Sequence, residues 1–133
     1  MEEIVIDAHN AILGRLASYA AKQALKGNNV KIVNCTGAVV TGNKANILGK
    51  YLTQRQRGGS AMNGPNFPSN PSRIMKRTVR GMLPYRQGRG LKALKEVKCY
   101  DSLPKNGVKG KMITMHNDTR AKTMTLGEIC KEI

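Results

Sequence analysis

Acidic residues are scarce in this sequence of 133 residues, which has 8 Asp and Glu against 23 Lys and Arg. No carboxylate occurs between residues 8 and 95, although the same stretch has 16 Lys and Arg. Enzymes that cut nucleic acids with metal ions hold those ions with carboxylates, so this shortage argues against that class. Positive charge this continuous repels itself unless a polyanion lies against it. The sequence therefore favours binding to a nucleic-acid backbone, with a basic surface that has no target as the alternative.

Cysteines and long apolar runs are scarce as well. The three cysteines, Cys35, Cys99 and Cys130, are far apart and form no CxxC motif, which argues against a disulfide framework or a zinc site. We expect free, buried thiols in a reducing cytoplasm. No run of 18 apolar residues is present, and the acidic start MEEIVIDAHN has no features of a signal peptide. The hydrophobic fraction of 40% suffices for a modest core, so we expect one domain over residues 1–133.

The hydrophobic pattern alternates between strand-like and helix-like segments. Strands are predicted over residues 4–6, 30–35, 38–41, 98–100 and 112–115, and helices over residues 12–26, 43–56, 71–80, 91–97 and from 125 onward. Asn10 and Asn70 are the predicted caps of the first and third helices. Strands and helices in this order predict an α/β fold with a mainly parallel sheet.

Residues 105–133 form a less regular tail that ends in a helix. Thr125 and Glu128 have the spacing of a capping box at the start of that helix. An apolar stripe follows and predicts that the helix docks on the body of the protein; it consists of Leu126, Ile129, Cys130 and Ile133.

Residues 71–83 carry the clearest functional signal. At 100° per residue, the four cations of this helix fall within an arc of about 100°: Arg73, Lys76, Arg77 and Arg80. The apolar side chains Ile74, Met75, Val79 and Met82 fall on the other side, which predicts that one face packs on the protein. A membrane-surface helix is the alternative, but this helix is short and has no aromatic anchor. The exposed face therefore suits phosphates.

Two loops rich in glycine and basic residues flank this helix. The first covers residues 57–70 and follows Arg55, and we expect it to be mobile in the free protein and ordered on RNA. The second covers residues 84–90 and contains Arg86 and Arg89. Glycines in such loops let the backbone approach a polyanion closely.

Some motifs imitate catalytic sites. Residues 37–44 nearly match a P-loop, but Asn43 separates the second glycine from Lys44 and no Ser or Thr follows. His9, His116, Ser18 and the cysteines have no partners in sequence that would make a metal site or a nucleophilic triad. We therefore expect no catalysis, no cofactor and no small-molecule substrate.

Several separate motifs resemble the universal ribosomal protein L-thirteen family of the large subunit. They are ILGRLAS at residues 12–18, VVTGNK at 39–44, RTVRGMLP at 77–84 and RG at 89–90. The short link before Val30 lacks the insertion typical of bacterial members, and NPSRI at 70–74 resembles the archaeal and eukaryotic branch. The sequence has no long C-terminal extension like that of eukaryotic members, so we expect an archaeal-type protein. The resemblance covers about residues 4–104. It implies a three-layer α/β/α domain with a parallel sheet of about four strands. It also implies a cytoplasmic ribosomal protein that binds large-subunit ribosomal RNA and lies beside neighbouring ribosomal proteins. The resemblance further implies a role in early subunit assembly.

The family resemblance extends the predicted RNA contacts beyond the basic helix. The predicted RNA-binding residues are Arg15, Lys44, Arg55, Arg57, Arg73, Lys76, Arg77, Arg80, Arg86, Arg89 and Lys92. For Arg15 and Lys44, a role in stabilising the fold is the alternative. For the whole protein, the alternative is a free-standing basic DNA-binding protein, although no helix-turn-helix, zinc finger or arm pattern is present.

Overall fold

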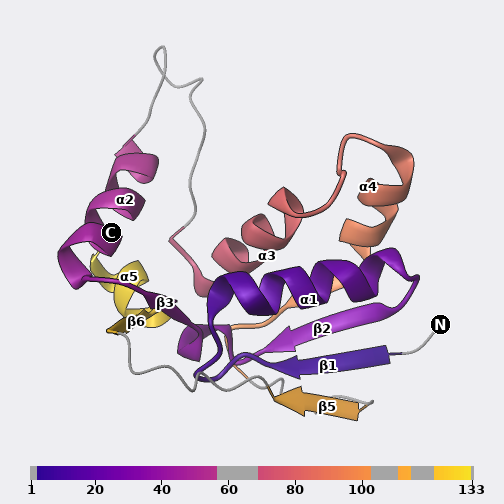
Figure 1. The fold of residues 1–133 in the computed structure, drawn as a ribbon, viewed down its shortest axis with the longest axis horizontal. Coiled ribbons are helices and arrows are strands. Elements are labelled where there is room, and N and C mark those ends of the chain that lie inside the picture. Colours follow the sequence, from indigo (N-terminus) through magenta and orange to yellow (C-terminus); the bar gives the residue numbers. More distant parts are fainter. Residues whose placement is uncertain (1–2, 57–68, 103–110, 115–121, 133) are drawn as a thin grey trace.

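A computed structural model describes residues 3–56, 69–102, 111–114 and 122–132. Its centre is a sheet of four parallel strands, β1 (Glu3–Asp7), β2 (Asn29–Val33), β4 (Val97–Cys99) and β5 (Lys111–Thr114). The order across the sheet is β4-β2-β1-β5 (Figure 1). Ile4 pairs with Val30, and Val30 pairs with Val97, so these β-branched residues form one continuous buried row.

Helix α1 (Leu13–Leu25) lies along one face of this sheet (Figure 1). Its buried residues recur at the spacing that predicted the helix, and they include Leu13, Leu16 and several alanines. Asn10 is not the cap, as the sequence predicted, because it lies in a left-handed turn with φ 57° and Ile12 occupies the cap position.

The predicted strand over residues 30–35 ends earlier than expected, at Val33. Asn34 adopts a left-handed conformation with φ 58°, and its side-chain amide donates a hydrogen bond of 3.0 Å to the Asp7 carboxylate. The chain then forms a short 3₁₀ helix, η1 (Cys35–Gly37). A left-handed residue cannot continue a strand, so this local turn overrides the β-rich sequence.

A second unit lies beside the carboxyl ends of β1 and β2 (Figure 1). Strand β3 (Val39–Thr41) pairs antiparallel with β6 (Thr123–Thr125), outside the main sheet, and the helices α2 (Lys44–Gln56) and α5 (Leu126–Glu132) pack against this pair. The Thr125 hydroxyl accepts a hydrogen bond of 3.2 Å from the Glu128 amide, which confirms the predicted cap. Leu126 and Ile129 are buried, so the helix docks as predicted; Ile133 lies outside the described residues.

Helices α3 (Pro71–Gly81) and α4 (Gly88–Lys95) complete the fold. Helix α4 begins three residues earlier than predicted, so part of the expected loop 84–90 is helical. The reason is a close approach: a side chain at Gly90 would overlap the Pro84 carbonyl, and glycine lets the first turn of the helix lie against that group. The expected loop over residues 57–70 lies almost wholly outside the described residues.

The described helices divide into two groups. α1, α3 and α4 lie together over the sheet and its β4 edge, whereas α2 and α5 accompany β3 and β6 (Figure 1). The predicted α/β class and the four-stranded parallel sheet are confirmed. Of the two helical layers expected, the described helices form one over the sheet. None of the helices in the described part of the chain is long and apolar enough to cross a membrane.

Candidate nucleic-acid interface

Helix α3 is held by its apolar side and by a carboxylate at its start. Ile74, Met75 and Val79 are fully buried, as predicted. Met82 was expected on the same face but is 43% exposed, because the helix ends at Gly81 and the chain turns away. Asn70 occupies the cap position without a side-chain capping bond. The Ser72 amide instead donates a 2.8 Å hydrogen bond to the carboxylate of Asp101, which follows β4.

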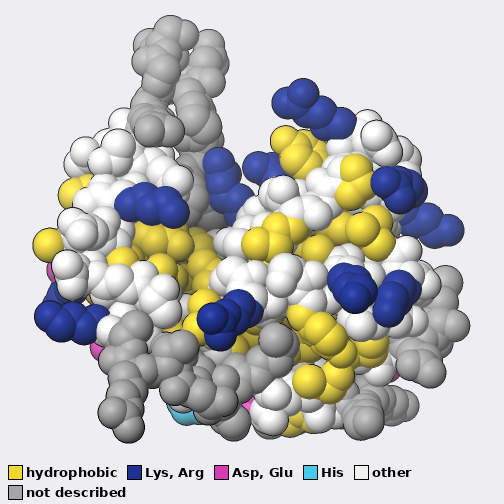
Figure 2. All heavy atoms as spheres, viewed as in Figure 1, with side chains coloured by type: hydrophobic (Ala, Val, Ile, Leu, Met, Phe, Trp, Pro, Cys, Tyr) yellow, Lys and Arg dark blue, Asp and Glu magenta, His cyan; other side chains and the backbone are white. Residues whose placement is uncertain are grey.

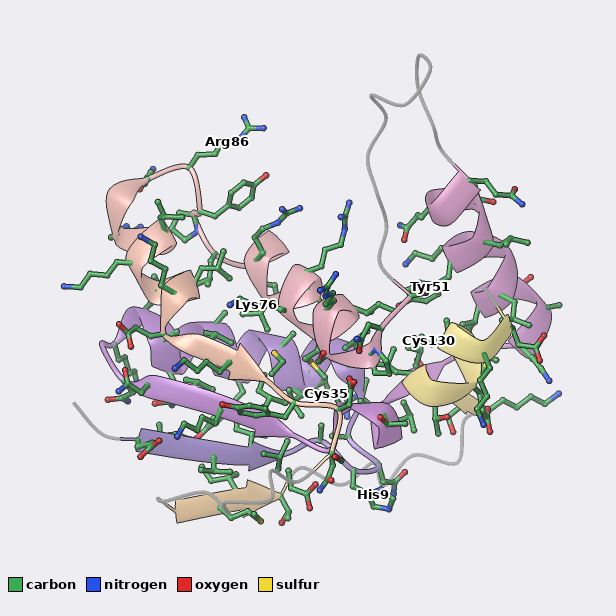
Figure 3. The ribbon with its side chains drawn as sticks, turned by 180° about the vertical axis from the view of Figure 1, so that it is seen from behind. His9, Cys35, Tyr51, Lys76, Arg86 and Cys130 are labelled. Atoms are coloured by element: carbon green, nitrogen blue, oxygen red, sulfur yellow. The ribbon has the colours of Figure 1, made fainter. Side chains whose placement is uncertain are left out.

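The opposite side of α3 borders an open groove of about 610 Å³, which we call the α3 groove. Its charged lining consists of the four cations predicted from the sequence and one more from β4: Arg73, Lys76, Arg77, Arg80 and Lys98. Arg73 and Lys98 are exposed, and the other three are half-buried. Figure 3 shows Lys76 between α3 and β4. None of the described residues that line this groove carries a carboxylate.

Aromatic and basic side chains continue this surface past the end of α3. The Arg80 guanidinium lies 5.1 Å from the ring centre of Tyr85, and that of Arg86 lies 6.0 Å from the same ring. Arg86 points away from the body of the protein (Figure 3). An exposed aromatic ring with two guanidinium groups near it offers both stacking and charge to a polynucleotide.

A second group of cations lies between α1 and α4. Arg89 and Lys92 line a hollow of about 350 Å³ together with Lys26 and Glu96. Arg89 was predicted in a loop but belongs to the first turn of α4. Figure 2 shows Lys and Arg side chains spread over this face of the molecule, whereas Asp and Glu side chains appear only at its margin.

The remaining predicted contacts are more dispersed. Arg15 lies on the exposed side of α1, and Lys44 is exposed at the first residue of α2. Neither side chain lines the α3 groove. Arg55 belongs to α2, and Arg57 lies outside the described residues. The structure thus brings together Arg73, Lys76, Arg77 and Arg80, and separately Arg89 and Lys92.

A different groove, of about 440 Å³, separates α2 from α3. We call it the α2–α3 groove. Its walls are largely apolar, and Figure 2 shows hydrophobic side chains on its floor. Polar and charged residues join them at the edges, among them Lys50 and Gln54 of α2 and Arg77 of α3. Arg77 therefore borders both grooves.

Of the three cysteines, all expected to be buried, Cys35 is buried, whereas Cys99 and Cys130 are half-buried. Cys35 is fully buried, and its thiol donates a 3.7 Å hydrogen bond to the Ile32 carbonyl. Hydrogen bonding with Cys99, together with burial, raises the pKa of the Cys35 thiol far above its ordinary value of 9.0. Within the described residues, no three His, Cys, Asp or Glu side chains come together in a way that could hold a metal ion.

Sequence reasoning missed three cations that the fold adds to these surfaces: Lys98, Lys50 and Lys26. Lys98 follows the buried Val97 in β4, and this alternation does indicate an exposed side chain. Nothing in the sequence shows that Lys98 faces α3, because that contact depends on where β4 joins the sheet. The cationic surface is therefore a tertiary feature built around one local helix.

Known proteins that are similar to this chain belong to one family. Residues 1–106 match the family model described as ribosomal protein L13. The "Large ribosomal subunit protein uL13" of Methanocaldococcus jannaschii is 43% identical over 97% of this chain and 96% of its own length. The proteins of the same description from Methanosarcina barkeri and Haloquadratum walsbyi are 43% and 41% identical, and cover 97% and 96% of this chain. In turn, the chain covers 96% and 88% of those proteins.

Proposed function

Because this chain belongs to the ribosomal protein L13 family, whose archaeal members are structural proteins of the large ribosomal subunit and not enzymes, we propose that it binds large-subunit ribosomal RNA through the α3 groove. The resemblance to archaeal members found in the sequence is thereby confirmed. The protein is a structural constituent of the large subunit, and RNA contact is the finer role that its surface supports.

The α3 groove is the single observation that carries this proposal. Five cations line it, and its described lining has no carboxylate that would neutralise them internally. Like charges three or four residues apart on α3 destabilise the helix by a few tenths of a kcal/mol per pair. Phosphates relieve that repulsion when they neutralise the cations, so the protein gains most from this surface when a polynucleotide occupies it.

The shape of the surface favours RNA over duplex DNA. The cations line a groove between a short helix and a strand edge, and α3 is packed against α1 along its apolar side. A helix placed this way does not project as a recognition helix does for the DNA major groove. Grooves with arginines and nearby aromatic rings instead suit the irregular, partly unstacked strands of folded RNA.

The proposal predicts a strong dependence of affinity on salt. If six to eight phosphates are neutralised, the logarithm of the binding constant falls against the logarithm of salt concentration with a slope of about −4 to −7. Filter binding with deproteinised large-subunit RNA and with duplex DNA of matched length measures this slope. A slope near zero, or equal affinity for both nucleic acids, contradicts the proposal and favours the DNA-binding alternative.

We also propose that the protein acts early in subunit assembly, beside neighbouring ribosomal proteins. A component that binds RNA through its own charged groove can associate before the surrounding proteins do. Depletion of the protein in cells should then accumulate large-subunit precursors that sediment more slowly than the mature subunit. Mature subunits that lack only this protein would contradict an early role.

A further inference from the structure

We propose that the α2–α3 groove receives an unstacked nucleobase of the RNA strand whose phosphates lie along the α3 groove. This inference rests on the proposed function and adds to it a specific site for one base. The two grooves lie on either side of α3 and share Arg77, so one strand can reach both without leaving the surface.

The walls of the α2–α3 groove suit the flat faces of a base. Ile12 at the start of α1 and Val40 of β3 are half-buried and present apolar surface to the groove. Beneath them lie the buried side chains of Leu13, Val39 and Ile74. The volume of about 440 Å³ falls in the range of pockets that hold small organic ligands, and a nucleoside is of that class. Base faces are apolar and sequence-tolerant partners for such walls.

Polar groups at the edges suit the rest of a nucleotide. The Gln54 amide can both donate and accept hydrogen bonds, as a base edge requires. Lys50 lies at the rim, with its ammonium group 6.0 Å from the ring centre of Tyr51, and Arg77 lies opposite on α3. Two cations beside an apolar slot favour an occupant that joins a flat apolar group to a phosphate. This charge complementarity selects a nucleotide over a purely apolar protein segment.

Gly14 keeps this groove open. It lines the groove from α1, and a side chain built at its position would meet no atom within 4 Å. A larger side chain there has room at its Cβ atom and should occupy part of the groove. Gly49 of α2 gives a matched control, because a side chain there also meets nothing within 4 Å and the residue does not line the groove.

The decisive test compares Gly14→Leu with Gly49→Leu in the full chain. We measure filter binding to deproteinised large-subunit RNA and check folding by urea melts. Gly14→Leu should weaken binding at least about fivefold, the lower end of what one stacked base contributes. The salt slope should stay unchanged, because no cation is lost. Gly49→Leu should bind like the unchanged protein. Equal affinity of all three proteins would overturn the proposal.

A second measurement covers the case in which Gly14→Leu fails to fold. Ultraviolet crosslinking of native large subunits, read by mass spectrometry, should attach a nucleotide to the peptide that contains Tyr51, which lines the α2–α3 groove and not the α3 groove. Crosslinks only at the α3 groove, near Tyr100, would refute the base site and leave RNA binding intact. If no peptide of this protein crosslinks and the free protein binds no RNA, the proposed function fails as well. A Gly14→Leu protein that binds RNA normally but is lost from subunits would indicate a protein occupant and would also refute the base site.

Discussion

Replacing two cations of the α3 groove should separate RNA binding from folding. Arg73 is exposed and Lys76 is half-buried, and the structure gives neither an ion pair with the described residues. The double variant Arg73→Gln and Lys76→Gln removes both charges while it keeps unbranched side chains that favour helix. Two lost phosphate contacts should flatten the salt slope by about 1.5 to 2 units and weaken binding by about tenfold or more.

The same variant should fold at least as well as the unchanged protein. The four cations of α3 form four like-charge pairs at a spacing of three or four residues, and the double variant leaves only the pair Arg77 and Arg80. Relief of three pairs at about 0.2–0.5 kcal/mol each raises the free energy of unfolding by about 0.6–1.5 kcal/mol, and by less where solvent screens the charges.

The assay consists of filter binding over a range of salt concentrations and one urea melt for each protein. Lys22 and Lys131 supply a control, because both are exposed cations near the ends of helices and neither lines a groove described above. Their replacement by Gln removes the same charge from elsewhere and should change the slope far less. If both double variants weaken binding equally, overall charge and not the α3 groove governs affinity. If the α3 variant unfolds, these side chains are structural.

Three further outcomes follow from buried positions. Val79→Ala should lower the free energy of unfolding by about 1–3 kcal/mol in a urea melt, because Val79 is fully buried. The folded fraction should keep its RNA affinity. Unchanged stability would refute the packing of α3. Gly90→Ala should lower the free energy of unfolding by about 1–3 kcal/mol, because its methyl group would overlap the Pro84 carbonyl. Gly88→Ala in the same helix should leave stability unchanged or raise it. Equal effects of the two substitutions would refute the contact at Gly90. The raised pKa of Cys35 means that the folded state favours the neutral thiol, so the free energy of unfolding should fall as the pH rises above the ordinary pKa of 9.0. Cys35→Ala should lessen this fall. Identical pH profiles of the two proteins would contradict a thiol held neutral beside Cys99.

The position of Asp101 shows how the protein tolerates an acidic residue next to the α3 groove. Its carboxylate accepts a hydrogen bond from the amide of Ser72 in the first turn of α3, where the helix dipole favours negative charge. Its backbone carbonyl accepts a second bond, 3.0 Å long, from the Thr36 hydroxyl of η1. The carboxylate is thus fixed at the start of α3, and the four cations that follow along the helix line the groove.

The sequence by itself determined the features that depend on neighbours a few residues apart. The spacing of Leu13, Leu16 and the alanines predicted α1, and the split of α3 into a cationic and an apolar side predicted which side is buried. Thr125 predicted the start of α5. Such patterns are legible because helical periodicity and capping are set by residues within one or two turns. Four of the five cations in the α3 groove were predictable for this reason.

The tertiary structure alone decided the features that join distant segments. It placed Lys98 opposite α3, because β4 joins β2 at the edge of the parallel sheet. It paired β3 with β6 instead of adding β3 to that sheet. It also started α4 early, because Gly90 meets the Pro84 carbonyl across a turn. Strand pairing and close backbone contacts depend on which distant segments meet in the folded chain. A local pattern of apolar and polar residues does not specify those partners.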